Sequence, residues 1–168
     1  MRILKLVGLF GLTALLGLAS CTKDKEETTQ LKIHLTDAPY NASAVNVDIR
    51  EVRVKLQKHD WISLPTNQGI YNLLEYQNGL DTVVATAVVP LDVLQEVRFV
   101  LGDANSIVIS GQTYPLTIPS GSESGLKIKL QKALSRDIDS LVADFDAALS
   151  IHQEGTGDYK LKPVIKLK

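Results

Sequence analysis

Two pairs of aspartates are the residues of this sequence whose type and spacing best suit chemistry. Asp137 with Asp139, and Asp144 with Asp146, are each separated by one residue. On a strand, residues two apart share a face at about 6 to 7 Å, which is near the carboxylate spacing of a retaining glycosidase. Paired carboxylates also bind calcium. Asp37, in a Thr-Asp-Ala-Pro corner, is either an Asx-turn residue or a further ligand.

Other features of the sequence favour a structural role for these aspartates over catalysis or calcium binding. A glycosidase needs a substrate cleft lined with aromatic side chains, and the 168 residues include only one Trp, five Tyr and three Phe. The calcium-loop pattern fails because no glycine stands at its sixth position. With Phe145 facing inward, Asp144 and Asp146 face outward, which favours solvated or turn-capping carboxylates. Asp37, Asp144 and Asp146 remain candidate ligand-binding residues.

Other catalytic and metal-binding patterns are incomplete. His34, His59 and His152 stand singly, without a second ligand at the spacing of a zinc motif. Ser124 and Lys127 have the S-x-x-K spacing of penicillin-recognising enzymes, but no K-T-G sequence accompanies them, which favours a turn. There is also no G-x-S-x-G elbow and no phosphate-binding glycine loop. We therefore expect no catalytic residue, no bound metal and no cofactor.

Exposed aromatic side chains are the residues best suited to bind carbohydrate, because their flat faces stack on sugar rings. The candidates are Trp61, Tyr40, Tyr71, Tyr76 and Tyr114. Core packing is the alternative for Trp61, which begins a predicted strand. Trp61 and Tyr71 are retained as candidate ligand-binding residues.

The first twenty residues have the pattern of an export signal. Two basic residues precede an uncharged apolar run over residues 6–19, which is too short to span a bilayer comfortably. The residues before Cys21 resemble the bacterial lipobox, and they are Leu18, Ala19 and Ser20. The sequence predicts that residues 1–20 are removed and that Cys21, the single cysteine, carries fatty acyl chains. An ordinary secretory peptide is the alternative.

The segment after the lipobox is polar, and we expect residues 21–30 to form a lipidated, flexible tether. Thr22 resembles the residue after the cysteine in lipoproteins sorted to the outer membrane. The Lys-Asp-Lys-Glu-Glu run is similar to a surface-export signal of some Gram-negative groups, and a periplasm-facing location is the alternative. Without Arg2 and Lys5, 16 basic and 19 acidic residues remain, a net charge of −3, so nucleic-acid binding is not expected.

From Leu31 onward the apolar residues recur with period two, which is typical of strands with one buried face. The apolar positions change from odd to even at Arg50 and Glu51, which predicts a β-bulge or a strand break. Residues 58–60 are predicted to form a hairpin turn. Many short strands about ten residues apart indicate one β-sandwich or barrel domain over residues 31–168. Further predicted strands are 70–74, 81–89, 95–101, 106–109, 112–118, 126–130 and 159–167.

An ordered set of short stretches resembles the domain-of-unknown-function family 4382, which occurs in exported and lipid-anchored proteins of bacteria and archaea. The stretches are spread over most of residues 31–168 in the family's order, and they are residues 35–39, 61–64, 71–74, 119–121 with 124–128, 144–147 and 159–165. The chain departs from the family after Val89, where residues 90–94 replace a glycine turn. The family has no established activity to carry over.

The resemblance implies an antiparallel β-sandwich of Greek-key type, similar to prealbumin-like and carbohydrate-binding-like modules. It implies a strand over residues 141–145 and a short helix or turn near 146–150. The apolar residues between Leu134 and Leu149 argue the other way, because their spacing alone fits a helix. We adopt the strand.

These observations favour a non-catalytic, lipid-anchored β-sandwich at the outer membrane, exposed on the cell surface or facing the periplasm. Its expected role is structural or is the binding of a glycan or another envelope protein. An Asp-based hydrolase or metal-dependent enzyme is one alternative. A subunit of a larger surface assembly is the other, and a large uncovered apolar sheet face would indicate it.

Overall fold

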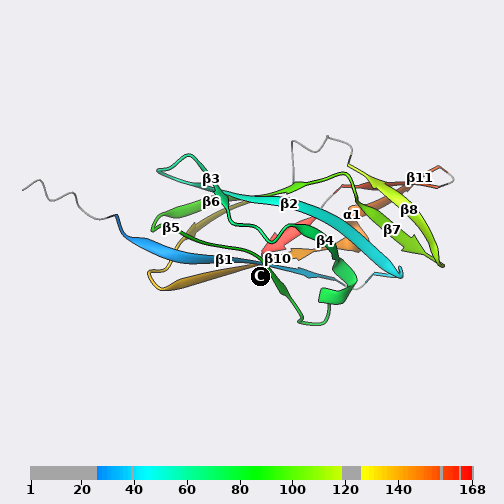
Figure 1. Ribbon diagram of the computed structural model, residues 1–168, viewed down its shortest axis with the longest axis horizontal. Coiled ribbons are helices and arrows are strands. Elements are labelled where there is room, and N and C mark those ends of the chain that lie inside the picture. Colours follow the sequence, from blue (N-terminus) through cyan, green and yellow to red (C-terminus); the bar gives the residue numbers. More distant parts are fainter. Residues whose placement is uncertain (1–25, 39, 119–125, 156, 163, 168) are drawn as a thin grey trace, which may run out of the picture.

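The structure is a computed structural model that describes residues 26–38, 40–118, 126–155, 157–162 and 164–167, and Figure 1 shows two β-sheets packed together. The four-stranded sheet is made of β1 (Thr28–Asp37), β5 (Thr82–Pro90), β10 (Ile138–Phe145) and β13 (Ile165–Leu167). The nine-stranded sheet is made of β2 (Ala44–Leu56), β3 (Trp61–Leu64), β4 (Gly69–Asn72), β6 (Val93–Leu101), β7 (Ser106–Ile109), β8 (Gln112–Thr117), β9 (Leu126–Ala133), β11 (Ile151–Glu154) and β12 (Asp158–Leu161). A 3-10 turn, η1 (Leu73–Tyr76), and a short helix, α1 (Ala147–Ser150), complete the described elements. The predicted all-β sandwich is confirmed.

The four-stranded sheet has the order β13-β10-β1-β5. β1 pairs antiparallel with β5 and parallel with β10, with Ile33 opposite Leu141. Alternate residues of β10 are buried, and they are Asp139, Leu141, Ala143 and Phe145. A strand therefore forms where local spacing also fits a helix, because pairing with β1 satisfies the backbone and buries one face. The helical turn expected near residues 146–150 is α1, whose first turn is capped by the Asp146 carboxylate accepting from Leu149 N at 3.0 Å.

The long strand β2 organises the nine-stranded sheet, because β3, β4, β6 and β7 all pair with it. The register between β2 and β6 shifts between Ile49 and Glu51, which confirms the predicted irregularity. After the shift, Val52, Val54 and Leu56 face the core in place of the odd-numbered residues. Residues 57–60 then connect β2 to β3 as a hairpin, as predicted.

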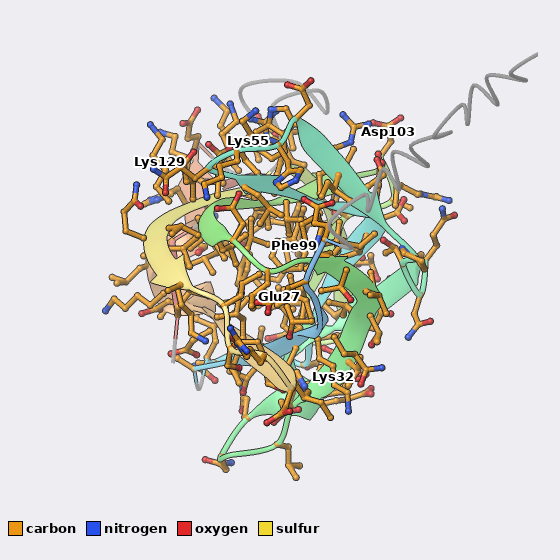
Figure 2. The ribbon with its side chains drawn as sticks, turned by 90° about the vertical axis from the view of Figure 1, so that its left-hand side faces the viewer. Glu27, Lys32, Lys55, Phe99, Asp103 and Lys129 are labelled. Carbon is orange, nitrogen blue, oxygen red and sulfur yellow. The ribbon has the colours of Figure 1, made fainter. Side chains whose placement is uncertain are left out.

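One apolar core lies between the two sheets. Phe99 of β6 and Phe145 of β10 are its largest fully buried side chains, and Leu31, Ile33 and Leu35 of β1 pack into the same cluster. Figure 2 places Phe99 near the middle of the molecule. The side chains on the outer faces of both sheets are therefore available for solvent or ligands.

Several local predictions differ from the structure. Residues 159–167, predicted as one strand, form β12 in the nine-stranded sheet and β13 in the four-stranded sheet. The predicted strand over 70–74 ends at Asn72, whose side chain caps η1. β11 was not predicted, and it pairs antiparallel with β12. Two pairings, β1 with β10 and β8 with β12, are parallel within otherwise antiparallel sheets.

The first strand begins at Thr28, inside the segment that was predicted to be a tether ending at residue 30. Thr29 and Gln30 pair with Val89 and Val88 of β5, and the Thr29 side chain is buried. The backbone carbonyl of Glu27 also accepts a hydrogen bond from Leu91 N at 2.8 Å. The folded part of the chain therefore extends three residues further towards Cys21 than the period-two pattern indicates.

Within the described residues, no helix is long and apolar enough to cross a membrane.

Candidate functional site

The outer face of β2, β3, β6 and β9 carries a concentration of basic side chains. Cross-strand register builds it in two rows, because residues opposite one another on neighbouring strands share a face. In one row Ser63, Arg53, Arg98 and Lys127 lie opposite one another on β3, β2, β6 and β9. In the next row the same strands contribute Trp61, Lys55, Glu96 and Lys129. We call Arg53, Lys55, Trp61, Arg98, Lys127 and Lys129 the cationic face.

Trp61 lies on this face and not in the core. Its strand neighbour is Lys55, and 38% of its surface is exposed. The guanidinium carbon of Arg98 lies 4.2 Å from the centre of the indole ring, a cation–π contact that joins β6 to β3. Core packing, the alternative weighed for this residue, is therefore wrong. The contact gives an aromatic surface with a cation beside it.

The two arginines of the cationic face are held by carboxylates on their own strands. Arg53 donates to Glu51 at 2.5 Å, and Arg98 donates to Glu96 at 2.9 Å. The Arg53 guanidinium, with a further hydrogen bond from the Ser63 hydroxyl, lowers the pKa of Glu51 below its usual range. Both carboxylates therefore fix arginine side chains in place.

The two lysines of β9 are exposed, and no ion pair holds Lys127 or Lys129 among the described residues. Beside them lies a shallow hollow of about 580 Å³, lined by Lys55, Gln95, Glu96, Lys129, Leu130 and Gln131. Figure 2 shows Lys55 and Lys129 at the periphery of the molecule, away from the buried Phe99. The face thus offers a flat, polar, accessible surface with an aromatic ring at one end of a row.

Asp37 is placed differently from the expected Asx-turn residue. It ends β1 on the same side as Leu35, and it is only 3% exposed. Its Oδ1 accepts from Ala147 N at 3.1 Å, and its Oδ2 has no hydrogen-bond partner among the described residues. Burial raises the pKa of Asp37 to about 6, against the lowering effect of the Ala147 hydrogen bond. The side chain ties β1 to the start of α1.

The other candidate aspartates do not form an acid–base pair with Asp37. Asp144 is partly buried on the outward side of β10, beside Lys166 of β13, and its charge contributes to the raised pKa of Asp37. Asp146 caps α1. Asp139 is buried and accepts hydrogen bonds from Lys132 and Ser135, so its pKa is lowered although burial alone would raise it. Among the described residues, no group of three or more His, Cys, Asp or Glu is placed to hold a metal.

Tyr71 does not join Trp61. Tyr71 lies opposite the buried Val47, so it faces the core side of the nine-stranded sheet, whereas Trp61 faces outward. Its hydroxyl donates to Asn67 O at 2.5 Å, and its ring lies 6.4 Å from that of Tyr76. Burial raises its pKa. Tyr71 therefore contributes to packing under β4.

The other aromatic candidates also pack internally. Tyr114 lies 5.1 Å from Tyr159, ring centre to ring centre, and Tyr40 is partly buried against the core. Of the predicted aromatic candidates, Trp61 is the one that the structure places on the cationic face.

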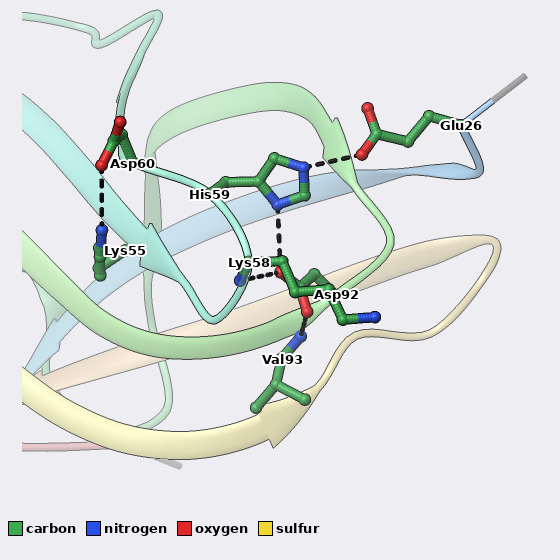
Figure 3. Close-up of polar contacts among 7 residues, drawn as sticks. All are labelled: Glu26, Lys55, Lys58, His59, Asp60, Asp92 and Val93. Carbon is green, nitrogen blue, oxygen red and sulfur yellow. Dashed lines mark hydrogen bonds and ion pairs between the residues drawn. The ribbon is translucent and has the colours of Figure 1, made fainter.

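His59 belongs to a separate polar cluster at the end of the molecule where β1 begins. Figure 3 shows its ring between two carboxylates, with Nε2 at 2.7 Å from Glu26 and Nδ1 at 3.1 Å from Asp92. Asp92 also accepts from Lys58 N at 2.7 Å. Glu26, with a second contribution from Asp92, raises the pKa of His59. The cluster joins the chain segment before β1 to the turns that precede β3 and β6.

The other two histidines are not assembled with His59. Nδ1 of His34 lies 2.6 Å from Asp81 on the outer side of the four-stranded sheet, and His152 is exposed on β11. The candidate lipidation residues Leu18, Ala19, Ser20 and Cys21 lie outside the described residues, as does Ser124.

Of the basic residues of the cationic face, only Lys127 was singled out from the sequence, and only as part of an S-x-x-K spacing. Lys127 and Lys129 alternate with apolar residues in β9, as Arg53 and Lys55 do in β2, so each strand shows a charged outer side. The alternation within a strand does not predict which strands pair with one another. The pairing of β3, β2, β6 and β9 is what brings these side chains together on one face.

A family model described as "Domain of unknown function (DUF4382)" matches residues 28–163. No curated protein and no solved structure matches the chain. The likeness to prealbumin-like and carbohydrate-binding-like modules stays a prediction.

Proposed function

The chain belongs to the DUF4382 family over residues 28–163, and from this premise we propose that it is a non-catalytic, lipid-anchored module of the cell envelope that binds glycan. The binding surface in this proposal is the cationic face, and the anchor is Cys21 at the outer membrane. The family supplies no activity, so the proposal depends on this chain's own residues.

The exposed Trp61 ring, fixed by Arg98 at 4.2 Å, is the observation that carries the proposal. An indole ring on a flat sheet face offers a stacking surface for a sugar ring, and neighbouring polar side chains can hydrogen-bond to hydroxyl groups. Arg53, Lys55 and Ser63 surround Trp61 through the registers of β2 and β3. The ring and these side chains together form a surface to which a sugar can bind without a deep cleft.

The anchor places the folded domain close to a bilayer. Cys21 lies five residues before Glu26, and five extended residues span at most about 18 Å. Several buried acyl chains on one cysteine hold a protein firmly, because each buried methylene contributes about 0.8 kcal/mol. The end of the sandwich at which β1 begins would then face the membrane, with the cationic face to one side (Figures 1 and 2).

A glycan array with the full-length chain in neutral detergent tests the binding role. We expect binding to at least one glycan class, and Trp61→Ala should weaken it by about tenfold or more, as removal of an aromatic anchor does. Trp61→Phe should retain part of the affinity. Ile70→Ala, which removes another exposed apolar side chain, is the matched control. Binding that is equal in the wild type and Trp61→Ala, or no binding on the array, would refute the proposal.

Two measurements test the placement. Mass spectrometry of the protein from cells should find acyl chains on Cys21 and no residue before it. Protease treatment of intact cells distinguishes the cell surface from the periplasmic side, because only a surface-exposed domain is cut. An unmodified thiol at Cys21 would contradict the anchor.

A subunit of a surface assembly remains a second candidate because of one apolar pair. Val88 of β5 and Ile138 of β10 both lie opposite Gln30 on the outer side of the four-stranded sheet, and they are 68% and 53% exposed. Contiguous exposed apolar surface is what marks protein–protein contacts, and this pair would be the centre of one. Chemical crosslinking in cells, compared between the wild type and Val88→Ser, would detect such a contact.

A further inference from the structure

We propose that the glycan bound by the cationic face is acidic, with carboxylate groups on its sugar units. This inference rests on the proposed function and names its ligand class. It follows from the charge of the face, the spacing of its cations and the position of Trp61 among them.

The face is basic although the chain as a whole is not. Five cations and two carboxylates, Glu51 and Glu96, project from its strands, and Asp60 lies 3.5 Å from Lys55 at the edge. The charge on the face is therefore about +2, while the chain without residues 1–20 has a net charge of −3. Such a local excess attracts an anion to this surface.

The cations are arranged in a way that suits an extended polymer. Arg53, Arg98 and Lys127 occupy one row across three strands, a distance of about 10 Å at the usual strand spacing. Lys55 and Lys129 occupy the next row, about 7 Å further along the strands, on either side of Glu96. An extended chain that lies across the strands meets a cation at successive units.

The ion pairs divide four of the five cations into two kinds, and the fifth, Lys55, lies 3.5 Å from Asp60 at the edge. Arg53 and Arg98 are oriented by their own carboxylates, and the stacked Arg98 guanidinium is held by Trp61 as well. A planar guanidinium that is already oriented can bind a carboxylate through two N–H groups with little loss of side-chain entropy. Lys127 and Lys129 carry the exposed positive charge that Glu51 and Glu96 do not neutralise.

The position of Trp61 favours a sugar polymer over other polyanions. Single-stranded nucleic acid is usually bound by several aromatic side chains in a basic groove, whereas this face has one ring and the chain is acidic overall. A lipid surface is disfavoured by the end of the molecule at which the described chain begins, because the proposed anchor precedes that end in the sequence. In Figure 2, which looks onto the end where β1 begins, Glu27 lies near the centre, and Lys55 and Lys129 lie at the edge.

Trp61 is the only tryptophan of the chain, so its fluorescence reports binding at this face directly. The full-length protein in neutral-detergent micelles is titrated with four probes: polygalacturonate, its full methyl ester, poly-L-glutamate, and phosphatidylglycerol added to the micelles. We expect polygalacturonate to bind, and to bind more weakly as salt screens the charges. The methyl ester should bind about tenfold or more weakly, because it has the same sugar backbone without the charge.

Two variants assign the interaction to the face. The double substitution Lys127→Gln and Lys129→Gln removes two exposed charges, so the fold is kept, and it should weaken polygalacturonate binding by about tenfold. Lys166→Gln, an exposed lysine on β13, is the control and should leave the affinity unchanged.

The outcomes separate this inference from the proposed function. Equal binding of polygalacturonate and its methyl ester, sensitive to Trp61→Ala, would overturn the acidic ligand and leave glycan binding standing. Equal binding of poly-L-glutamate would show a site for polyanions in general, and an equal response to phosphatidylglycerol would show a site for lipid headgroups; either result overturns the inference. No response to either polysaccharide, together with a silent glycan array, would overturn both proposals.

Discussion

Replacing Asp37 with asparagine should stabilise the folded protein at neutral pH. Asp37 is 3% exposed, and burial raises its pKa from 3.8 to about 6. Asparagine keeps the oxygen that accepts from Ala147 N and removes the charge. The neutral side chain also avoids repulsion from Asp144, which contributes to the raised pKa. The substitution therefore tests whether the buried carboxylate opposes folding.

The sign and size follow from linkage. A pKa that is higher in the folded state means that folding favours the protonated carboxyl group. Asp37 therefore adds to stability below its unfolded pKa of 3.8, and that contribution is lost as the pH rises through about 6. A shift of about two pKa units corresponds to at most about 3 kcal/mol, so we expect Asp37→Asn to raise the free energy of unfolding by about 1 to 3 kcal/mol at pH 7.

Urea unfolding followed by circular dichroism, at a series of values from about pH 4 to about pH 8, measures this effect. The difference between Asp37→Asn and the wild type should be small near pH 4 and grow to its full size near pH 7. Taking the difference cancels other titrating groups. Asp103→Asn, which removes an exposed carboxylate, is the control. A variant that is less stable at pH 7, or a difference that does not change with pH, would refute the reasoning.

Three further predictions concern other parts of the fold. Gly102→Ala should destabilise the protein by about 1 to 3 kcal/mol in urea unfolding, because an added Cβ would lie 2.2 Å from Oδ2 of the buried Asp48; unchanged stability would contradict this close packing. His59→Gln should lower the free energy of unfolding at and below the ordinary histidine pKa, because the protonated ring of the wild type stabilises the fold there. The wild type loses this stabilisation as the pH rises through the raised pKa of His59, so the difference between the two proteins should disappear at higher pH. An NMR titration should show that the pKa of His59 falls when Glu26→Gln is introduced. A chain beginning at Leu31 should melt at a lower temperature than one beginning at Thr22, because it lacks the β1 residues that pair with Val88, Val89 and Pro90; equal melting temperatures would place the true boundary at Leu31.

Much of the strand pattern was predictable because it is local. Alternation of side chains predicted β1, the two halves of β2 and the irregularity between Ile49 and Glu51. Local spacing alone favoured a helix between Leu134 and Leu149, and the strand over residues 141–145 was adopted from the family resemblance. Pairing with β1 and β13 decided that segment, and such pairings lie far outside any local window.

The candidate site was predictable only in part. The sequence named Trp61 as an aromatic candidate, but it did not predict its exposure or its contact with Arg98, which is 37 residues away along the chain. It also indicated a turn at Asp37. In the structure Asp37 is the last residue of β1, lies on the same inward face as Leu35 and is buried. In both cases the surroundings of the side chain come from a different strand.

By itself, the sequence determined the period-two strands and the family, because both depend on short patterns of neighbouring residues. A pattern of the same kind predicts a lipid anchor at Cys21. The tertiary structure alone decided that Arg53, Arg98 and Lys127 form one row and that Asp37 is buried. The physical reason is that a single strand specifies which of its side chains share a face, whereas the charge and burial of that face depend on the strands that pair with it.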